Sequence, residues 1–479
     1  MKHRLLAAAA LPLALLASSA FAETKPAAAK EPAKKDTAKP EKDPNDFYRA
    51  AKSYSTTPET DPPRYVRTLS KTGIDAFKNL NWLEGGLELR ERLEVRDGDL
   101  RRNVQTNDSP LLQRSRLYVG VKEILDPLRF TVELQDSRRW FSDFVTDDRD
   151  YDQLDILQGY GELHFKDALG KDAPVRLRAG RMSFEVLDRR LIARNEWRNT
   201  TNSFQGFRAL IGQQKNVWDL DMFALQPIRR NLHETDDPID RQWMYGIIGA
   251  WRKWSDIVTF QPYYLNLRQD QITTAQTRNI HSPGIRAYGV IPGTAYDFDL
   301  SATYQFGSDG GRDHRALGTV AEVGYTFAHD WKPRLSANYG YASGDRRPND
   351  RKNERFERFF GFSRPWSNND YFQFENVHAP KARIEITPSK DLRADAGVSA
   401  YWLASKTDRW NAVNLRDATG SRGSYLGDEI DGRIRYKLHP LVDSTVGYAW
   451  FNPGKFTRLS GRGQDTHFLY IELTFRAFE

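Results

Sequence analysis

The sequence predicts an all-β fold, a transmembrane antiparallel β-barrel of about 18 strands. Two observations predict it. From residue 82 to the C-terminus, apolar and polar residues alternate in segments of about ten residues, as in strands with one face in lipid and one in water. The connections between these segments alternate between short turns and long polar loops, which is typical of barrels with short periplasmic turns and long extracellular loops.

The predicted strands show this alternation over their whole length. The first, GLELRERLEVR at 86–96, sets leucine and valine against glutamate and arginine, and the segments 113–122, 128–137 and 296–306 repeat the pattern. The last, FLYIELTFRAFE at 468–479, is apolar at alternate positions and ends close to an aromatic residue. A period of two places one set of side chains on each face of a strand.

The connections follow in the order that a barrel requires. Short connections lie at 125–127, 170–174, 212–216, 252–255, 329–332, 387–390 and 439–442. Long connections lie at 97–111, 138–154, 184–203, 226–240, 343–372 and 404–423. Many aromatic residues stand near the segment ends, where barrels carry interfacial girdles.

The N-terminus has the features of a secretory signal peptide. Lys2 and Arg4 precede an apolar run that ends in small residues at Ala20 and Ala22. The run is short and alanine-rich, which disfavours the alternative of a membrane anchor. The expected domains are a signal peptide (1–22), a disordered Lys/Ala/Pro linker (23–47), an N-terminal periplasmic or plug segment (48–81) and an outer-membrane β-barrel (82–479). We therefore expect the protein in the outer membrane of a Gram-negative bacterium.

Composition argues against several classes of function. The chain has no cysteine, which excludes disulfides, thiol nucleophiles and thiolate metal sites. No Gly-x-Ser-x-Gly or His-Glu-x-x-His motif occurs, so we expect no catalytic residues and no enzyme; an outer-membrane protease or acyl-hydrolase is the enzymatic alternative. The net charge of +7 does not indicate nucleic-acid binding, because secretion removes that partner. No cofactor and no metal is predicted.

The charged faces of the strands are expected to line an aqueous lumen, because a barrel of about 18 strands is too wide for its side chains to fill. Guanidinium groups stay charged and pair with carboxylates, so inward arginines are predicted to form a cationic wall that binds sugar acids weakly and repeatedly. The predicted wall consists of Arg90, Arg92, Arg96, Arg114, Arg116, Arg129, Arg176 and Arg178. The alternative is that these arginines pair with Glu88, Glu94, Glu133 and Glu162 and stiffen the wall without selecting a solute.

Three stretches carry more specific motifs. They are residues 177–210, with Gly180 and Arg181 followed by Phe204 and Gly206; residues 339–350, with Ser343, Gly344 and Asp345; and residues 425–456, with Gly427, Glu429 and Asp431. Together they resemble the alginate export porin family, and the resemblance spans residues 175–478. It implies an outer-membrane barrel that passes alginate or a related polymer. It also implies pore-lining roles for Arg181, Arg198, Asp345, Glu429 and Asp431.

Two residues depart from the pattern of that family. Met182 stands where many members have glutamine, and Gln205 stands where many have aspartate. Both are polar pore positions in the family, so a solute other than alginate is the alternative.

The segment 343–370 is rich in arginine and aromatic residues. A solvated extracellular loop is the first expectation. The alternative is a gate that folds inward, with aromatic rings stacked on sugars and arginines bound to carboxylates. Asp345, Asn349 and Asp350 carry oxygen ligands that could bind calcium, but the twelve-residue spacing of a known calcium loop is absent.

The function predicted from the sequence is an outer-membrane porin that passes anionic solutes, in the first place an acidic polysaccharide such as alginate or its oligosaccharides. The alternatives are a general or differently selective porin for small anions or other substrates, and a structural or adhesive barrel that carries no current. The expected partners are an anionic polysaccharide or oligosaccharide, outer-membrane lipid and periplasmic secretion or degradation proteins, with no nucleic acid.

Overall fold

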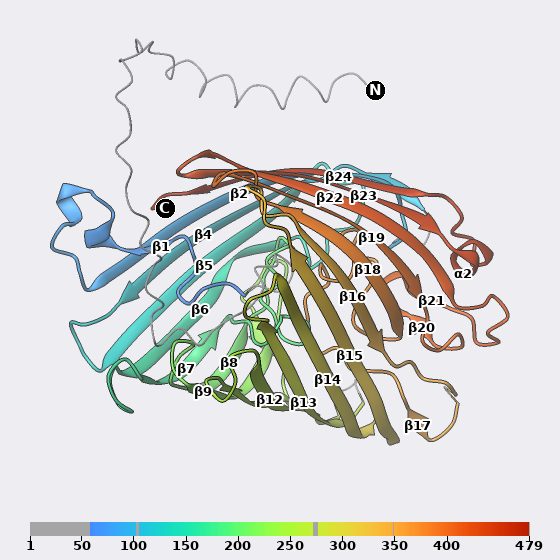
Figure 1. Ribbon diagram of the computed structural model, residues 1–479, viewed down its shortest axis with the longest axis horizontal. Coiled ribbons are helices and arrows are strands. Elements are labelled where there is room, and N and C mark those ends of the chain that lie inside the picture. The colour runs from blue at the N-terminus through green and yellow to red at the C-terminus, as the bar shows by residue number, and fades with distance from the viewer. Residues whose placement is uncertain (1–57, 102–104, 272–275, 348, 479) are drawn as a thin grey trace, which may run out of the picture. The chain divides into compact units, whose positions relative to one another are not determined.

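The fold is that of a computed structural model, which describes residues 58–101, 105–271, 276–347 and 349–478 (Figure 1). The predicted signal peptide and linker lie outside the described residues, as does the part of the predicted plug segment that precedes residue 58.

Eighteen long antiparallel strands form a closed barrel, which confirms the predicted fold class. They are β2 (Leu83–Asp99), β4 (Leu111–Val121), β5 (Leu128–Trp140), β6 (Asp152–Phe165), β7 (Val175–Met182), β8 (Phe204–Ile211), β9 (Trp218–Arg229), β11 (Gln242–Trp251), β12 (Thr259–Gln269), β13 (Arg278–Val290), β14 (Tyr296–Asp309), β15 (Arg312–Thr326), β16 (Arg334–Ala342), β18 (Val377–Ile386), β19 (Leu392–Trp402), β22 (Tyr425–His439), β23 (Val442–Pro453) and β24 (Thr466–Arg476).

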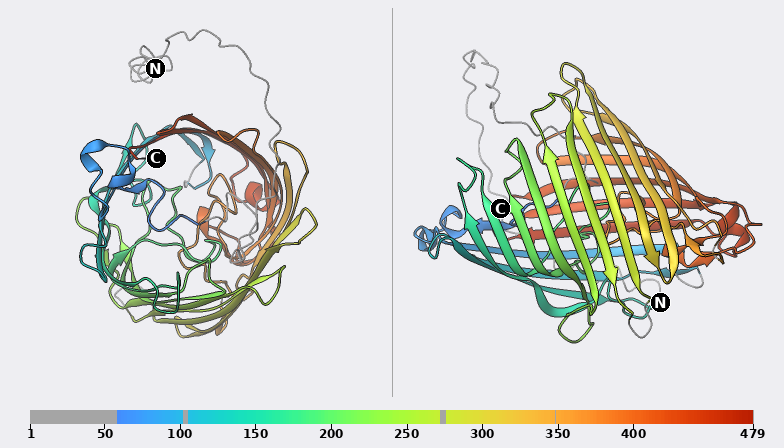
Figure 2. Two further views of the ribbon diagram at one scale, coloured as in Figure 1. Left: turned by 60° about the vertical axis from the view of Figure 1, so that its left-hand side comes forward. Right: turned by 90° about the horizontal axis from the view of Figure 1, so that it is seen from below.

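The sheet closes because β24 pairs with β2, from Glu88 opposite Arg476 to Asp97 opposite His467. The left view of Figure 2 shows the ring of strands around segments that lie inside it. A closed sheet has no free edge, so its backbone groups are satisfied within the sheet, as the hydrocarbon core of a membrane requires. No helix among the described residues is long and apolar enough to span a membrane.

Shorter elements decorate the barrel. They are the strands β1 (Val66–Thr68), β3 (Thr106–Asp108), β10 (Asp237–Pro238), β17 (Lys352–Asn353), β20 (Arg409–Trp410) and β21 (Leu415–Arg416), the 3-10 helices η1 (Leu69–Lys71), η2 (Asp75–Phe77) and η3 (Asn411–Val413), and the helix α2 (Lys455–Leu459).

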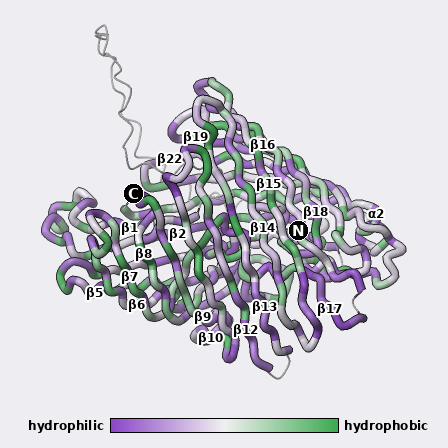
Figure 3. Tube along the Cα trace, turned by 60° about the horizontal axis from the view of Figure 1, so that its bottom comes forward, coloured by the Kyte–Doolittle hydropathy of each residue, from purple (hydrophilic) through white to green (hydrophobic). Residues whose placement is uncertain are grey.

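The alternation seen in the sequence sorts the side chains between the two faces of the sheet. On β2, Leu89 and Leu93 are 40% and 38% exposed on the outer face, whereas Arg90 on the inner face is 4% exposed. Figure 3 shows hydrophilic and hydrophobic residues interspersed along the strands. Glu91 is an acidic residue on the outer face, and it accepts a hydrogen bond of 2.7 Å from the amide of Gln113 on β4. This neighbour partly satisfies the carboxylate.

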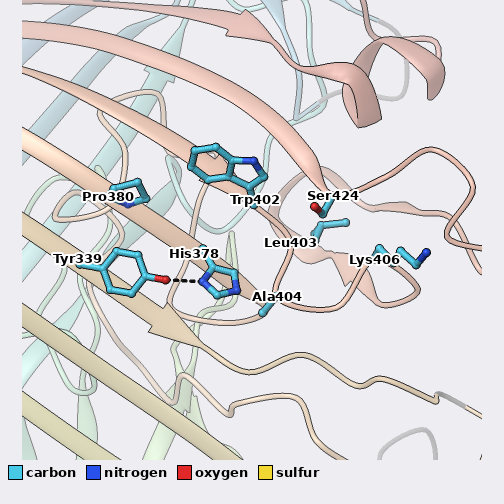
Figure 4. Close-up of a pocket in the computed structure, with 8 residues that line it drawn as sticks. All are labelled: Tyr339, His378, Pro380, Trp402, Leu403, Ala404, Lys406 and Ser424. Atoms are coloured by element: carbon cyan, nitrogen blue, oxygen red, sulfur yellow. Dashed lines mark hydrogen bonds between the residues drawn. The ribbon is translucent and has the colours of Figure 1, made fainter.

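Aromatic residues lie at the strand ends on the outer face. Beside the short periplasmic turn between β11 and β12, the rings of Trp254 and Phe260 stack at 4.7 Å between centroids. Beside a long extracellular loop, Trp402, Tyr339 and His378 line a shallow pocket, where a hydrogen bond of 2.6 Å joins the Tyr339 hydroxyl to Nδ1 of His378 (Figure 4). Both groups stand where an interfacial girdle is expected.

Two long connections fold into the barrel instead of leaving it: residues 183–203, between β7 and β8, and residues 343–376, between β16 and β18. They bind each other, since the amide of Phe360 donates to the carbonyl of Leu191 at 2.9 Å and the amide of Ala193 donates to the carbonyl of Phe360 at 3.2 Å. We call them the first and the second inner loop.

The main hydrophobic core lies inside the barrel, between the two inner loops and the inner faces of the strands. The loops contribute, among others, Phe184, Leu191, Ile192, Phe356, Trp366, Phe372 and Phe374. Phe356 and Trp366 are 0% and 2% exposed, so a solvated loop at 343–370 is the wrong expectation for this part. This part of the segment folds inward, as the alternative of an inward gate expected. The rings of Phe356 and Trp366, however, pack in the core rather than face an open lumen.

Candidate functional site in the barrel lumen

The inner faces of β2 and β4 carry the first five arginines of the predicted cationic wall. All five side chains point inward and are nearly inaccessible, with exposures between 1% and 4%. They are Arg90, Arg92, Arg96, Arg114 and Arg116. Their inward direction follows from the period of two. The first inner loop lies against four of them, and Arg96 instead donates to the carbonyl of Asn369 in the second inner loop at 3.4 Å.

These arginines hold the first inner loop through its main chain. Nη1 of Arg90 donates to the carbonyl of Glu196 at 2.7 Å, and its Nη2 donates to the carbonyl of Arg198 at 2.9 Å. Nη1 of Arg92 donates to the carbonyl of Trp197 at 2.7 Å, and its guanidinium lies 3.8 Å from a ring centroid of the same residue. Three consecutive carbonyls of the loop are therefore bound to the wall of the barrel.

Carboxylates neutralise the same arginines. The Glu196 carboxylate of the first inner loop lies 2.8 Å from Arg116, 3.2 Å from Arg114 and 2.9 Å from Arg194. Burial alone would raise its pKa, but these three guanidinium groups hold the pKa of Glu196 well below its usual range. Glu196 is therefore an anion that joins the first inner loop to β4 of the wall.

Within the wall itself, Glu94 binds Arg92 and Arg96, each at 3.0 Å, and Glu88 binds Arg114 at 2.9 Å. The charges of β2 and β4 are thus largely matched in place.

The predicted arginines of β5 and β7 lie toward the periplasmic end, except for Arg181. Nε of Arg129 is 3.7 Å from Asp126 in the adjacent turn. Arg176 and Arg178 both contact Asp61, and Arg178 also binds Glu162 on β6.

At the extracellular end of β7, Arg181 donates to the carbonyl of Ile156 at 3.0 Å and to the carbonyl of Asp236 at 2.7 Å. Its side chain therefore joins the end of β6 to the loop that precedes β10.

The predicted acidic residues hold the second inner loop. Glu429 on β22 accepts hydrogen bonds from the Ser367 hydroxyl at 2.6 Å and from the Asn368 amide at 2.7 Å. Asp431, two positions along the same face, contacts the side chains of Asn368 and Arg383.

Asp345 binds Arg312 at 3.0 Å, and its own amide donates to Asp408 at 2.8 Å. Like Glu429 and Asp431, it anchors a loop at the inner wall.

Arg198 is the one residue of the predicted set whose charge has no partner among the described residues. Its side chain is half-buried and makes no hydrogen bond or ion pair with them, although its carbonyl binds Arg90. Burial, and then repulsion by Arg149, Arg230 and Arg358, lower the pKa of Arg198 to about 9. The nearby carboxylate of Asp370 is already bound by Nε1 of Trp197 at 2.8 Å.

Arg149 has the same lack of a partner. It lies in the loop 141–151 between β5 and β6, it is half-buried, and its side chain also makes no hydrogen bond or ion pair with a described residue. The amide of Thr200 donates to the carbonyl of Arg149 at 3.1 Å, so the loop that carries Arg149 lies directly against the first inner loop.

The four arginines of this cluster come from four different loops. Arg230, in the connection that follows β9, donates to the carbonyl of Asp148 at 2.8 Å and binds its carboxylate at 3.1 Å. Arg358, in the second inner loop, lies 3.7 Å from Glu375. We call Arg149, Arg198, Arg230 and Arg358 the arginine cluster. It can bind an anion, because two of its four charges are unmatched by described residues.

Sequence reasoning found Arg198 but missed Arg149, Arg230 and Glu196. These three residues lie in long connections without periodicity, so no pattern marks the direction of their side chains. The only signal was the presence of arginine in several neighbouring extracellular connections.

Comparisons with known proteins agree with the geometry. The profile described as alginate export matches residues 81–470. No curated protein matches the chain. The crystal structure of Pseudomonas aeruginosa OccK11 (OpdR) is 15% identical, covers 82% of this chain and 95% of that chain, and has a TM-score of 0.55.

Two further structures from Pseudomonas aeruginosa show the same fold. OpdQ is 14% identical, covers 82% of this chain and 97% of that chain, and has a TM-score of 0.57. OpdK, crystallised with vanillate, is 11% identical, covers 82% of this chain and 98% of that chain, and has a TM-score of 0.56. The fold and the family profile together support porin function. The chain belongs to the alginate export family, and it is a β-barrel of the Gram-negative outer membrane.

Proposed function

We propose that this porin passes anionic solutes, in the first place an acidic polysaccharide such as alginate or its oligosaccharides, and that it catalyses no reaction. Membership of the alginate export family supports an acidic polymer. The observation that carries the proposal is the arginine cluster, where Arg149 and Arg198 are half-buried without a partner among the described residues.

An unpaired charge that is partly removed from water is costly, so proteins pair such charges or use them. The described arginines that are half-buried or buried otherwise all have a hydrogen bond or an ion pair. The lowered pKa of Arg198 has the same physical origin, namely burial and repulsion by neighbouring arginines. A solute carboxylate placed between Arg149 and Arg198 would offset both the cost of burying these charges and the repulsion between them.

The cluster is suited to transit rather than to retention. Arg230 and Arg358 already bind Asp148 and Glu375, so the solute meets only the two unmatched charges at full strength. Binding that is strong enough to enter and weak enough to leave is what conduction requires. A polyuronate repeats one carboxylate on every sugar, so it replaces the departing carboxylate with the next one.

The remaining residues of the predicted wall act in this proposal through the positions that they fix. Arg90 and Arg92 hold the main chain beside Arg198, and Glu429 holds the second inner loop, which carries Arg358. In this proposal the arginine cluster contacts the solute, and the residues of the predicted wall hold the loops that carry the cluster.

The alternative of a porin for small anions rests on the same cluster, since two guanidinium groups also bind a single carboxylate. The two functions differ in the dependence on chain length. A polymer pore is blocked more strongly by longer oligomers, whereas a small-anion pore responds to the concentration of carboxylate groups alone.

The test is conductance in planar bilayers under a salt gradient, with the wild type and Arg198→Gln. We expect the wild type to prefer anions, and Arg198→Gln to move the reversal potential toward the value for no selectivity. Arg149→Gln should do the same. Arg229→Gln is the matched control, because Arg229 is adjacent to Arg230 but exposed.

In the same bilayers, an alginate hexamer should block the current more than neutral maltohexaose, and Arg198→Gln should remove most of the difference. Cation preference in the wild type, or equal block by the charged and the neutral hexamer, would contradict the proposal.

A further inference from the structure

A short N-terminal segment enters the barrel at its periplasmic end. The strand β1 pairs with the start of β2, with Val66 opposite Gly86, beyond the last pair that β2 makes with β24. The short turns that follow β4 and precede β23 lie at this same end, which makes it the periplasmic side. We call residues 59–66 the strap.

The strap is docked on the inner wall by specific contacts. Tyr65 is 2% exposed, packs against Tyr118 on β4, and donates its hydroxyl to Glu133 on β5. A Cβ atom at Gly86 would lie 2.8 Å from the ring of Tyr65, so the glycine leaves the space that the tyrosine fills. The amide of Glu59 donates to the carboxylate of Glu185 in the first inner loop at 2.7 Å.

The docked strap brings Asp61 to the arginine pair of β7. Oδ2 of Asp61 lies 2.8 Å from Nη2 of Arg178 and 3.5 Å from Nη1 of Arg176. Burial would raise the pKa of Asp61, but Arg178, Arg176 and then Arg208 hold it well below its usual range. The carboxylate is therefore charged, and 45% of its side chain remains exposed.

Arg176 differs from the arginines of β2 in the source of its counter-charge, whereas Arg178 also has Glu162 of the neighbouring strand β6 at 2.5 Å. Arg90 and Arg92 have Glu472, a residue of the neighbouring strand, within 3.8 Å and 3.3 Å. The ion pair seen for Arg176 is with Asp61 of the strap, and its Nε atom is buried without a hydrogen bond. A carboxylate from outside the barrel strands thus occupies this position.

We propose that Arg176 and Arg178 form a carboxylate-binding site at the periplasmic mouth, that Asp61 is its internal occupant, and that the carboxylates of an oligouronate compete with Asp61 for it. The identity of the competing solute rests on the function proposed above, whereas the exchange of the strap does not. In this arrangement the strap closes the site in the absence of polymer and yields to it.

The tether determines which solutes can compete. Asp61 is fixed through β1 a few residues away, and a short tether gives an effective concentration in the millimolar range. A single carboxylate must therefore reach about millimolar concentration to displace it. An oligouronate presents several carboxylates on one chain. It should therefore compete with Asp61 at a lower total concentration of carboxylate groups than acetate does.

The first test measures block of the current by an alginate hexamer added on the periplasmic side of an oriented bilayer. Asp61→Asn keeps the size of the side chain and removes its charge, and it should lower the half-blocking concentration about tenfold. Arg176→Gln should raise it. Asp75→Asn, the same change at an exposed position of η2, should have no effect. An unchanged half-blocking concentration in Asp61→Asn would overturn the proposal.

The second test follows the strap directly and does not depend on transport. The chain has no cysteine, so Pro63→Cys places a single thiol at a buried position of the strap. The alginate hexamer should accelerate maleimide labelling of this thiol in liposomes, and maltohexaose should not. Asp61→Asn in the same background should be labelled fast without hexamer.

The two tests separate the two proposals. If the channel prefers anions but the rate of maleimide labelling is the same with and without the hexamer, the exchange of the strap is refuted and the proposed function stands. Labelling that responds to the hexamer in a channel without anion preference would refute the proposed function and leave the exchange standing.

Discussion

Glu196→Gln tests whether one half-buried carboxylate holds the first inner loop in the lumen. Glu196 lies within 3.2 Å of three guanidinium groups, those of Arg114, Arg116 and Arg194, whose side chains are all less than 5% exposed. Glutamine has nearly the same shape but no charge, so the three cations lose a shared counter-ion. Removing one partner of a buried ion pair costs about 3 to 5 kcal/mol.

The expected consequence is a looser loop. At the lower end of that range, about 3 kcal/mol, the ratio of released to docked loop rises on the order of 100-fold. Release exposes Arg114 and Arg116 to the lumen with less negative charge beside them. The single-channel conductance should therefore become larger and noisier, and the preference for anions should increase.

The assay is single-channel recording of Glu196→Gln beside the wild type. Glu354→Gln is the matched control, because Glu354 is 3.8 Å from an arginine that is 75% exposed, and such pairs contribute about 0 to 1 kcal/mol. If Glu196→Gln leaves conductance, noise and selectivity unchanged, the carbonyl contacts of Arg90 and Arg92 hold the loop by themselves, and the reasoning from Glu196 is wrong.

Two further predictions concern stability and pH. Arg334→Gln removes the cation that Asp297, Glu322 and Glu385 share at 2.7, 2.8 and 3.1 Å. The free energy of unfolding, measured in urea, should therefore fall by about 3 to 5 kcal/mol. Arg315→Gln removes one partner of an exposed ion pair and should lower it by less than about 1 kcal/mol. The pKa of Asp61 is lowered in the folded protein, so its contribution to docking of the strap is complete above the ordinary carboxyl pKa of about 3.9 and is lost only as the pH falls through the lower folded value. Hydrogen exchange of the strap, corrected for intrinsic rates, should therefore show equal protection at pH 8 and pH 5; a loss of protection between these values would contradict the ion pair with Arg178.

The barrel was predictable from the sequence because its determinants are local. The alternation around Arg90 fixes which residues of β2 face inward, and the alternation of short and long connections fixes where the strands turn. Neither inference needs to know which strand lies next to which. The closure of β24 on β2 then follows from the number of strands.

The contents of the lumen were not predictable in the same way, because their determinants are pairs that are distant in the sequence. Arg116 and Glu196 are 80 positions apart, and Arg176 and Asp61 are 115 positions apart. The aromatic residues of 343–370 have no period that would indicate a buried segment. Trp366 is buried because Gly340 on β16 leaves room for its ring, where a Cβ atom would lie 2.1 Å away.

The orientation of a charge and its role are therefore separate properties. Arg90 points into the lumen, and its guanidinium binds the first inner loop: it donates to the main-chain carbonyls of Glu196 and Arg198 and to the side-chain oxygen of Asn199. The side chain of Arg198 makes no hydrogen bond with the described residues. Since matched charges on rigid strands give a wall that is stiff but nearly neutral to a passing solute, we expect selectivity to come from charges that the loops leave unmatched. On this argument, changes in the loops that carry Arg149 and Arg198 alter the choice of solute, while changes in the arginines of β2 and β4 alter the shape of the bore.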